Sequence, residues 1–231
     1  MITPKLSIVI PTLNEAETIE RLIKHLKKMA IQPELLELIV VDGGSTDDTQ
    51  SLAKKNEATV IESSKGRAKQ MNAGAAIAQG AILYFLHADS FPPEHYDQHI
   101  YNEVGKLNLA GCFRMRFDSN HWWLRLASWL TQFSWRACRG GDQSQFITKK
   151  LFEKLGCFDE SYIIYEDNDL INKLYAIDEF VVINKKLTTS ARRYRQNGTW
   201  RLQYHFLAIY VKKWMGANAE ELYDYYKRNI A

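Results

Sequence analysis

Three short apolar runs of the sequence each end in polar residues that could do chemistry. The first is followed by Thr12 and Glu15, the second by Asp42, and the third by His87 and Asp89. These side chains can hydrogen-bond a base or a ribose, and a carboxylate can also hold a divalent ion that neutralises a diphosphate. The alternative is ordinary turn and helix-start chemistry, in which the same residues close turns or begin helices.

A second group of charged residues lies further along the sequence. Glu166, Asp167 and Asp169 place three carboxylates within four residues, and such crowding raises a carboxyl pKa and favours a general base. At the start of a helix the same residues would complement the helix dipole. Arg67, in a basic turn, can pair with a phosphate or a carboxylate, or remain solvated. Both interpretations of each motif stay open on these residues alone.

Several common sites are absent from this sequence of 231 residues. A dinucleotide-binding site needs a glycine-rich turn after the first strand, and Pro11–Glu15 contains no glycine. The phosphate-binding loop of nucleoside triphosphatases is also absent. The net charge of +3 is too small to indicate nucleic-acid binding, and a hydrophobic content of 46% excludes a disordered chain.

The cysteines and the apolar segments indicate the compartment. Cys112, Cys138 and Cys157 form no redox or metal-binding motif, which favours a reduced protein of the cytoplasm. The first ten residues lack the pattern of a signal peptide. The longest segment without an acidic or basic residue, 70–88, contains polar residues and two glycines. We therefore expect no membrane-spanning helix, although a helix can still lie on a bilayer surface.

A repeating pattern of strands and helices must position the residues of the first half. Short apolar runs predict strands, and apolar residues at helical spacing predict the helices between them, one with a capping box at Ser45 and Asp48. Strands joined in this way form a parallel sheet, and its ligands gather at the carboxyl ends of the strands. The expected strands span 6–10, 37–41, 58–61 and 81–86, and the expected helices 15–28, 47–55 and 66–78.

The second half is less regular and ends in a basic tail. From Arg192 to Ala231 there are eight bases and three acids, a net charge of +5, which favours an anionic ligand or surface. We expect one compact body followed by a helical appendage. The expected strands span 111–117, 143–147 and 180–183, and the expected helices 121–139, 149–155, 166–175, 199–215 and 219–228.

Taken together, the motifs resemble a known family. Ser7–Glu15, Val40–Asp47, the Ala-Asp pair at 88–89 and Glu166-Asp167 resemble the family 2 glycosyltransferases of GT-A fold in their order, spacing and strand context. The segments 67–74, 141–143 and 189–193 are similar to a small bacterial subgroup labelled as associated with radical-SAM and selenium-domain proteins. The resemblance covers most of the chain. It implies an α/β fold with a mainly parallel sheet flanked by helices.

The resemblance also implies an activity and a domain plan. The reaction is an inverting, metal-assisted transfer of a sugar from a nucleotide-sugar donor, a UDP-sugar, to an acceptor hydroxyl. The plan is a GT-A domain at 1–191, with a nucleotide-binding half at 1–90 and an acceptor half at 91–191, and then the basic helical appendage at 192–231.

Each implied role falls on a residue of this sequence. The metal, Mn²⁺ or Mg²⁺, falls on Asp89, and the base falls on Asp167. His87 departs from the family pattern, since many members carry an acid there, and this leaves the strength and choice of the metal open. Residues implied for the acceptor are Gly141, Asp142, Gln143 and Glu166, and those for the donor are Pro11, Thr12, Glu15, Asp42, Arg67, Asn72, His87, Arg192 and Arg193.

Two of the expected helices carry wide aromatic faces beside basic residues. Such helices either pack on the body or on a second copy of the chain, or they lie at the inner face of a membrane and meet a lipid-linked acceptor. Both interpretations stay open. The apolar faces contain Trp122, Trp123, Leu126, Trp129, Leu130, Phe133 and Trp135 in the helix at 121–139, and Trp200, Tyr204, Leu207 and Val211 in the helix at 199–215.

Two other functions compete with glycosyl transfer. A sugar nucleotidylyltransferase needs a glycine-rich, arginine-containing loop after the first strand, and this sequence has none there. A non-catalytic nucleotide-sugar binder or membrane-surface protein would have no need of Asp89 and Asp167. The sequence does not identify the sugar or the acceptor.

Overall fold

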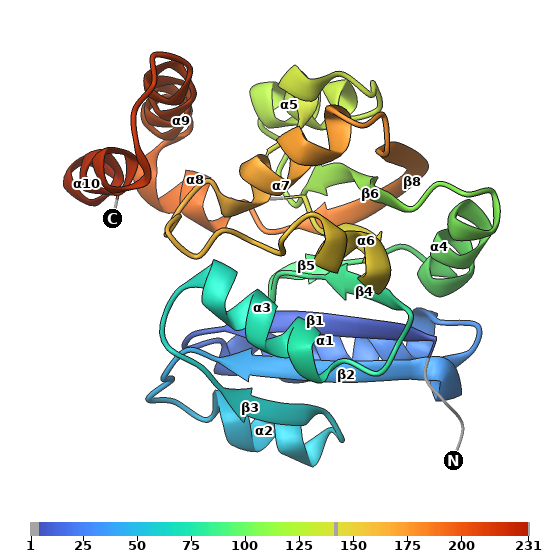
Figure 1. Ribbon diagram of the computed structural model, residues 1–231. Coiled ribbons are helices and arrows are strands. Elements are labelled where there is room, and N and C mark those ends of the chain that lie inside the picture. Colours follow the sequence, from blue (N-terminus) through green and yellow to red (C-terminus); the bar gives the residue numbers. More distant parts are fainter. Residues whose placement is uncertain (1–4, 141–142, 231) are drawn as a thin grey trace.

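Short β-branched runs in the first half of the chain form four parallel strands. The structure, a computed structural model, describes residues 5–140 and 143–230 (Figure 1). The register aligns Thr12 with Asp42, so the first two strands end level with each other. The four strands lie in the order β3-β2-β1-β4 and are β1 (Leu6–Thr12), β2 (Leu36–Asp42), β3 (Thr59–Glu62) and β4 (Ile82–Phe85).

Helices cover both faces of these strands because alternate side chains of each strand point in opposite directions. On one face, Ile8 and Ile10 of β1 pack in one core cluster with Leu22 of α1 (Ala16–Met29). On the other face, Val9 packs in a second cluster with Met71 of α3 (Arg67–Ile77). The strands are therefore apolar on both sides, as expected for a parallel sheet covered by helices. α2 (Thr49–Lys55) lies beside α1 and β3.

Gly74 lets α3 approach the sheet closely. A Cβ at this position would lie 2.4 Å from Cγ1 of Val9 and 2.9 Å from Cγ2 of Val41. We expect Gly74→Ala to lower the free energy of unfolding by about 1–3 kcal/mol, because overpacking outweighs the gain in helix propensity. Urea unfolding measures this change. Gly105→Ala is the control, since no atom lies within 4 Å of its Cβ position; an equal effect of both substitutions would contradict the packing argument.

The second half of the chain extends the sheet with strands of both directions. β7 (Gln145–Thr148) runs antiparallel to β4 and to β6 (Ala110–Phe117), whereas β8 (Val181–Thr189) runs parallel to β6. The short β5 (Ser90–Phe91) closes the order β3-β2-β1-β4-β7-β6-β8-β5. The predicted α/β fold with a mainly parallel sheet is confirmed. The helices of this half are α4 (Tyr96–Gly105), α6 (Lys149–Lys154) and α7 (Glu166–Tyr175).

The last three helices pack on the second half of the sheet. Leu202, Ile209 and Leu222 form a third core cluster with Phe117 of β6 and Leu124 of α5. The tail therefore shares this core with the rest of the chain. The domain boundary expected at residue 191 stays a prediction. The elements are α5 (Trp122–Leu130), α8 (Arg192–Asn197), α9 (Thr199–Trp214) and α10 (Ala219–Asn229). None of the described helices has the length and apolar character needed to cross a bilayer.

The structure corrects the sequence predictions in two places. The helix expected over 121–139 ends at Leu130, because the guanidinium of the buried Arg139 donates to the carbonyl oxygens of Thr131 and Phe133, both at 2.6 Å. The capping box expected at Ser45 and Asp48 is absent from α2. The sequence pattern also does not predict α4, β5 or α8.

Candidate functional site

Asp42 is held as a carboxylate at the carboxyl end of β2. It is fully buried, and it accepts hydrogen bonds from the backbone N–H groups of Gly44 at 3.0 Å and Ser45 at 2.8 Å and from Nε2 of Gln50 at 3.0 Å. Burial acts to raise the pKa of Asp42, but the hydrogen bonds from Ser45, Gln50 and Gly44 outweigh it and lower the pKa. Asp42 therefore presents negative charge at this edge of the sheet.

The buried ends of β1 and β2 are joined by a residue that the sequence analysis missed. Nε2 of Gln70, on α3, donates to the carbonyl oxygens of Thr12 and Val41, both at 2.8 Å. Thr12 and Pro11 are buried beside them. The missed signal is a glutamine at a buried position of an alanine-rich helix, since a buried amide needs partners.

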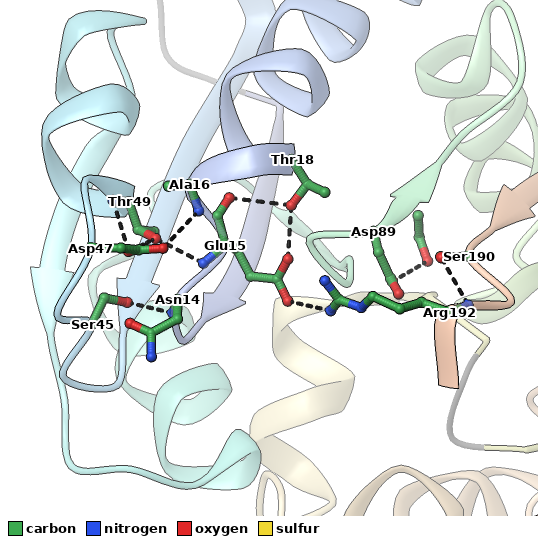
Figure 2. A network of polar contacts seen from close by, with 11 residues as sticks. Asn14, Glu15, Ala16, Thr18, Ser45, Asp47, Thr49, Asp89, Ser190 and Arg192 are labelled. Atoms are coloured by element: carbon green, nitrogen blue, oxygen red, sulfur yellow. Dashed lines mark hydrogen bonds and ion pairs between the residues drawn. The ribbon is translucent and has the colours of Figure 1, made fainter. Parts of the chain in front are cut away.

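The two loops that follow β1 and β2 bind each other (Figure 2). The backbone N–H of Asn14 donates to Oγ of Ser45 at 2.8 Å, and that of Glu15 donates to Oγ1 of Thr49 at 2.8 Å. Oδ2 of Asp47 accepts from the backbone at the start of α1 at 3.1 Å. α2 begins at Thr49 with Asp48 as its N-cap residue, so Ser45 lies in the loop before the helix, which explains the missing capping box.

Arg192 connects the tail of the chain with the first half of the sheet. Its Nη2 lies 2.9 Å from Oε1 of Glu15, a residue 177 positions earlier in the sequence (Figure 2). The hydrogen bond and the charge of Glu15 raise the pKa of Arg192, and the charge of Asp89 adds to this effect. The carboxyl end of β1, the segment after β4 and the start of α8 therefore meet at one place.

His87 and Asp89 follow β4, and both are half-buried. Ser90, the next residue, is buried, and its hydroxyl forms a hydrogen bond of 3.0 Å with the hydroxyl of Thr189 on β8. Because β5 pairs with β8 at this point, the segment that carries Asp89 is held firmly beside Ser190 and Arg192 (Figure 2).

Arg67 and Glu166 join the starts of α3 and α7. Nε of Arg67 lies 2.7 Å from Oε1 of Glu166, whose side chain is fully buried. The next two residues, Asp167 and Asn168, are 3% and 5% exposed. Three polar residues at the start of α7 are thus removed from bulk water, where an ionisable group interacts more strongly with a neighbouring charge.

Other predicted site residues are engaged in holding the fold. Nδ2 of Asn72 donates to the carbonyl oxygen of Phe158 at 2.9 Å. Oε1 of Gln143 accepts from Nη1 of Arg139, and Nε2 of Gln143 donates to the carbonyl oxygen of Cys138, both at 3.1 Å. Nη2 of Arg193 donates to the hydroxyl of Tyr226 at 2.6 Å, on the side of α10. Gly141 and Asp142 lie outside the described residues.

Comparison with known proteins identifies the family. Residues 7–170 match the family model "Glycosyl transferase family 2". The chain belongs to this family. Glycosyltransferase AglE of Haloferax volcanii is 30% identical over 100 residues, which make up 40% of this chain and 33% of AglE. The matched region therefore makes up about a third of the length of AglE.

Solved structures share the GT-A fold of this family 2 member. The mannosyltransferase PcManGT of Pyrobaculum calidifontis, in complex with GDP-Man and Mn²⁺, superposes with a TM-score of 0.67 at 21% identity over 98% of this chain and 70% of its own. S. aureus TarS in complex with UDP gives a TM-score of 0.64 at 18% identity over 81% of this chain and 60% of its own.

A buried glutamine of this family 2 member stands out beside the predicted residues. Gln145 is 2% exposed, and neither of its side-chain amide atoms has a hydrogen-bond partner in the described part of the chain. It pairs with Phe85 at the end of β4 and lies on the same face of β7 as Ile147, which packs in a cluster with Leu170 of α7. Gln145 therefore lies between the end of β4 and α7. The resemblance to the family implied Gln143 instead.

Proposed function

We propose that this chain transfers a sugar from a nucleoside diphosphate sugar, a UDP-sugar, to the hydroxyl of an acceptor, with inversion at the anomeric carbon. The observation that carries this proposal is the meeting of Glu15, Asp89 and Arg192 at the carboxyl edge of the sheet. In open α/β sheets this edge is where ligands bind. The complexes of TarS with UDP and of PcManGT with GDP-Man support a nucleotide as ligand.

The donor fits the chemistry of the first half of the site. Asp42, lowered in pKa and fully buried, can accept a hydrogen bond from the imide of a pyrimidine or from a ribose hydroxyl. Thr12 and Pro11 lie beside it at the end of β1. Arg192 supplies the positive charge that a diphosphate requires, and Glu15 holds its guanidinium in place before the donor binds.

A divalent ion, Mn²⁺ or Mg²⁺, fits Asp89. No group of three or more His, Cys, Asp or Glu side chains gathers to hold a metal among the residues that the structure describes. Such ions need few protein ligands when substrate phosphates complete the coordination, so one carboxylate, with His87 beside it, is a sufficient anchor. When bound, the ion neutralises the diphosphate leaving group. The Mn²⁺ of PcManGT supports this assignment.

Asp167 is the residue that we assign as general base. Its carboxylate would take the proton of the acceptor hydroxyl, which attacks the anomeric carbon on the face opposite the diphosphate. One displacement with one base inverts that carbon. The ion pair of Arg67 with Glu166 fixes the residue next to this base, and it joins the two halves of the site.

The acceptor meets the second half of the site. We assign Glu166 and the segment 141–143 to its binding, and a lipid-linked acceptor is the form that we favour. Gln143 contributes through the hydrogen bonds that hold the end of this segment to Arg139 and Cys138. We place the reaction in the cytoplasm, at the inner face of the membrane, in agreement with the three free cysteines of the chain.

A panel of nucleotide sugars tests the donor assignment. We expect UDP-sugars with Mn²⁺ or Mg²⁺ to raise the midpoint of thermal unfolding, since a ligand that binds only the folded state stabilises it. Release of the nucleoside diphosphate in the presence of an acceptor extract then reports transfer. If no nucleotide sugar shifts the midpoint with either metal, the proposed donor site is wrong.

Gln145 provides a test that separates function from stability. We propose that its amide hydrogen-bonds a hydroxyl of the reacting sugar. Gln145→Met removes a buried amide that has no protein partner, so we expect an unchanged or higher unfolding midpoint together with a fall of about ten-fold in kcat/KM. Gln143→Met is the control: it removes the partner of Arg139, and we expect a lower midpoint. An unchanged kcat/KM in Gln145→Met would refute this role.

A further inference from the structure

The described part of the chain gathers its exposed apolar side chains in one region. Fifteen large hydrophobic side chains are exposed, and ten of them belong to α5, to α9 or to the segments that follow these two helices. We call this set the aromatic surface. Its members are Trp122, Leu126, Trp129, Trp135, Trp200, Tyr204, Leu207, Val211, Trp214 and Met215. A patch of this kind on a folded protein marks a binding surface.

The packing of α9 shows that this exposure is one face of an amphipathic helix. Leu202 and Ile209 are buried in the third core cluster, while Trp200, Leu207 and Trp214 point outward at intervals of seven residues, with Trp214 87% exposed. α9 is therefore apolar on two sides. The inner side is used in the fold, and the outer side is left for a partner.

The two helices present their apolar faces together. The rings of Trp122 and Trp200 lie 5.7 Å apart, and those of Trp123 and Trp200 lie 5.3 Å apart, so α5 and α9 meet at their first turns. Figure 1 shows both helices at the end of the molecule that is opposite to β3 and α2. The apolar faces of the two helices are thus joined at the tryptophans of their first turns.

The charge around the aromatic surface identifies its partner. No acidic residue occurs in 119–140 or in 180–219, the segments that contain both helices, and the acids that follow, Glu220, Glu221 and Asp224, lie on α10 at the side of α9 that carries Lys212. Arg125, Arg201 and Lys212 are exposed on α5 and α9. A symmetric interface with a second copy would bring these bases near their own equivalents where they lie close to the two-fold axis. An anionic surface instead complements them, because each base near such a surface is attracted to it.

We propose that the aromatic surface docks the protein on the anionic face of a lipid bilayer. The indole ring suits the boundary between lipid and water, because it is large and apolar but carries one hydrogen-bond donor. Exposed apolar residues with basic neighbours on one helix are the pattern of an interfacial helix. The docking does not require the proposed transfer reaction, so the two proposals can fail separately.

The tryptophans give a direct readout of docking. Five of the six tryptophans of the chain lie in α5 or α9, and the sixth, Trp135, lies in the segment after α5. Vesicles of phosphatidylglycerol and phosphatidylcholine should shift their fluorescence to shorter wavelength and carry the protein with them in flotation. Binding should weaken as salt rises, because the charges of the bases are screened. Equal binding to phosphatidylcholine alone would overturn the role of charge.

Matched variants test the surface itself. Leu207→Ser with Trp214→Ser should lower partition onto the anionic vesicles by at least about ten-fold without changing the unfolding midpoint, since both side chains are exposed. Ile31→Ser is the control, because Ile31 is exposed elsewhere. Arg201→Glu with Lys212→Glu should also lower partition onto the anionic vesicles. Lys28→Glu with Lys54→Glu is the control for charge, because it changes the net charge by the same amount and should lower this partition less.

Two results would overturn this proposal. The first is partition that the α9 variants reduce no more than their controls do. The second is a stable dimer in solution that Leu207→Ser with Trp214→Ser converts to monomer, which would assign the aromatic surface to a second copy of the chain.

Discussion

Asp167→Asn is expected to lower the turnover of sugar transfer by about 10²–10⁴-fold, the range by which general bases accelerate reactions. Asparagine keeps the shape of the side chain but cannot take the proton of the acceptor hydroxyl. The affinity for the nucleotide sugar should stay close to that of the wild type, because the donor residues lie on other elements. Steady-state release of the nucleoside diphosphate gives turnover, and calorimetry gives the affinity.

Asp169 supplies the control for this experiment. It lies on the first turns of the same helix and pairs at 2.9 Å with Lys173, on the same helix. Asp169→Asn should therefore keep most of the activity, since it removes a partly exposed ion pair that contributes little. If Asp167→Asn keeps turnover similar to that of Asp169→Asn, another residue is the base.

Asp89→Asn is expected to abolish the dependence of donor binding on Mn²⁺. In the presence of the ion we expect the affinity for the nucleotide sugar to fall by about 100-fold or more, because the carboxylate that anchors the ion is lost. In the presence of EDTA the variant and the wild type should bind the donor with similar, low affinity. Calorimetric titration under both conditions measures the difference.

Asp48 is a suitable control for the metal ligand. It is an exposed carboxylate in the same half of the chain, and its side chain makes no capping hydrogen bond with α2. Asp48→Asn changes the net charge by the same amount as Asp89→Asn. Donor binding by Asp89→Asn that still responds to Mn²⁺ as the wild type does would remove Asp89 from the metal site.

The parallel half of the fold could be predicted because its signals are local. The run at 37–41 is apolar on both faces and stops at a turn, and the structure has β2 as Leu36–Asp42. The helix expected over 66–78 is α3 at Arg67–Ile77. Carboxyl ends of neighbouring parallel strands meet by necessity, so the grouping of Thr12 with Asp42 followed from the order of elements.

The features that could not be predicted depend on contacts between distant residues. The helix expected over 121–139 has a continuous amphipathic pattern, but a buried arginine at its far end takes the carbonyl oxygens of Thr131 and Phe133 and stops it. The pairs of Arg192 with Glu15 and of Arg67 with Glu166 are likewise tertiary. The sequence offered these residues as separate ligand candidates, whereas the structure places them in contact with each other.

The contact of Arg192 with Glu15 also bears on how the site opens. The two residues form a part-exposed ion pair, which is weak enough in water for a ligand to compete with it. A bound diphosphate would draw the guanidinium away from the carboxylate toward its own oxygens. We therefore divide the basic tail between Arg192, which we assign to the donor, and the exposed bases of α9, which we assign to the proposed docking surface.

Titration of the wild-type chain with UDP in the presence of Mn²⁺, followed by calorimetry, tests the donor site most directly. We predict that one UDP binds per chain, that EDTA weakens this binding strongly, and that Asp89→Asn removes the effect of Mn²⁺. Absence of binding by UDP and by every other nucleoside diphosphate, with Mn²⁺ or Mg²⁺ present, would contradict a nucleotide-sugar site at this edge of the sheet.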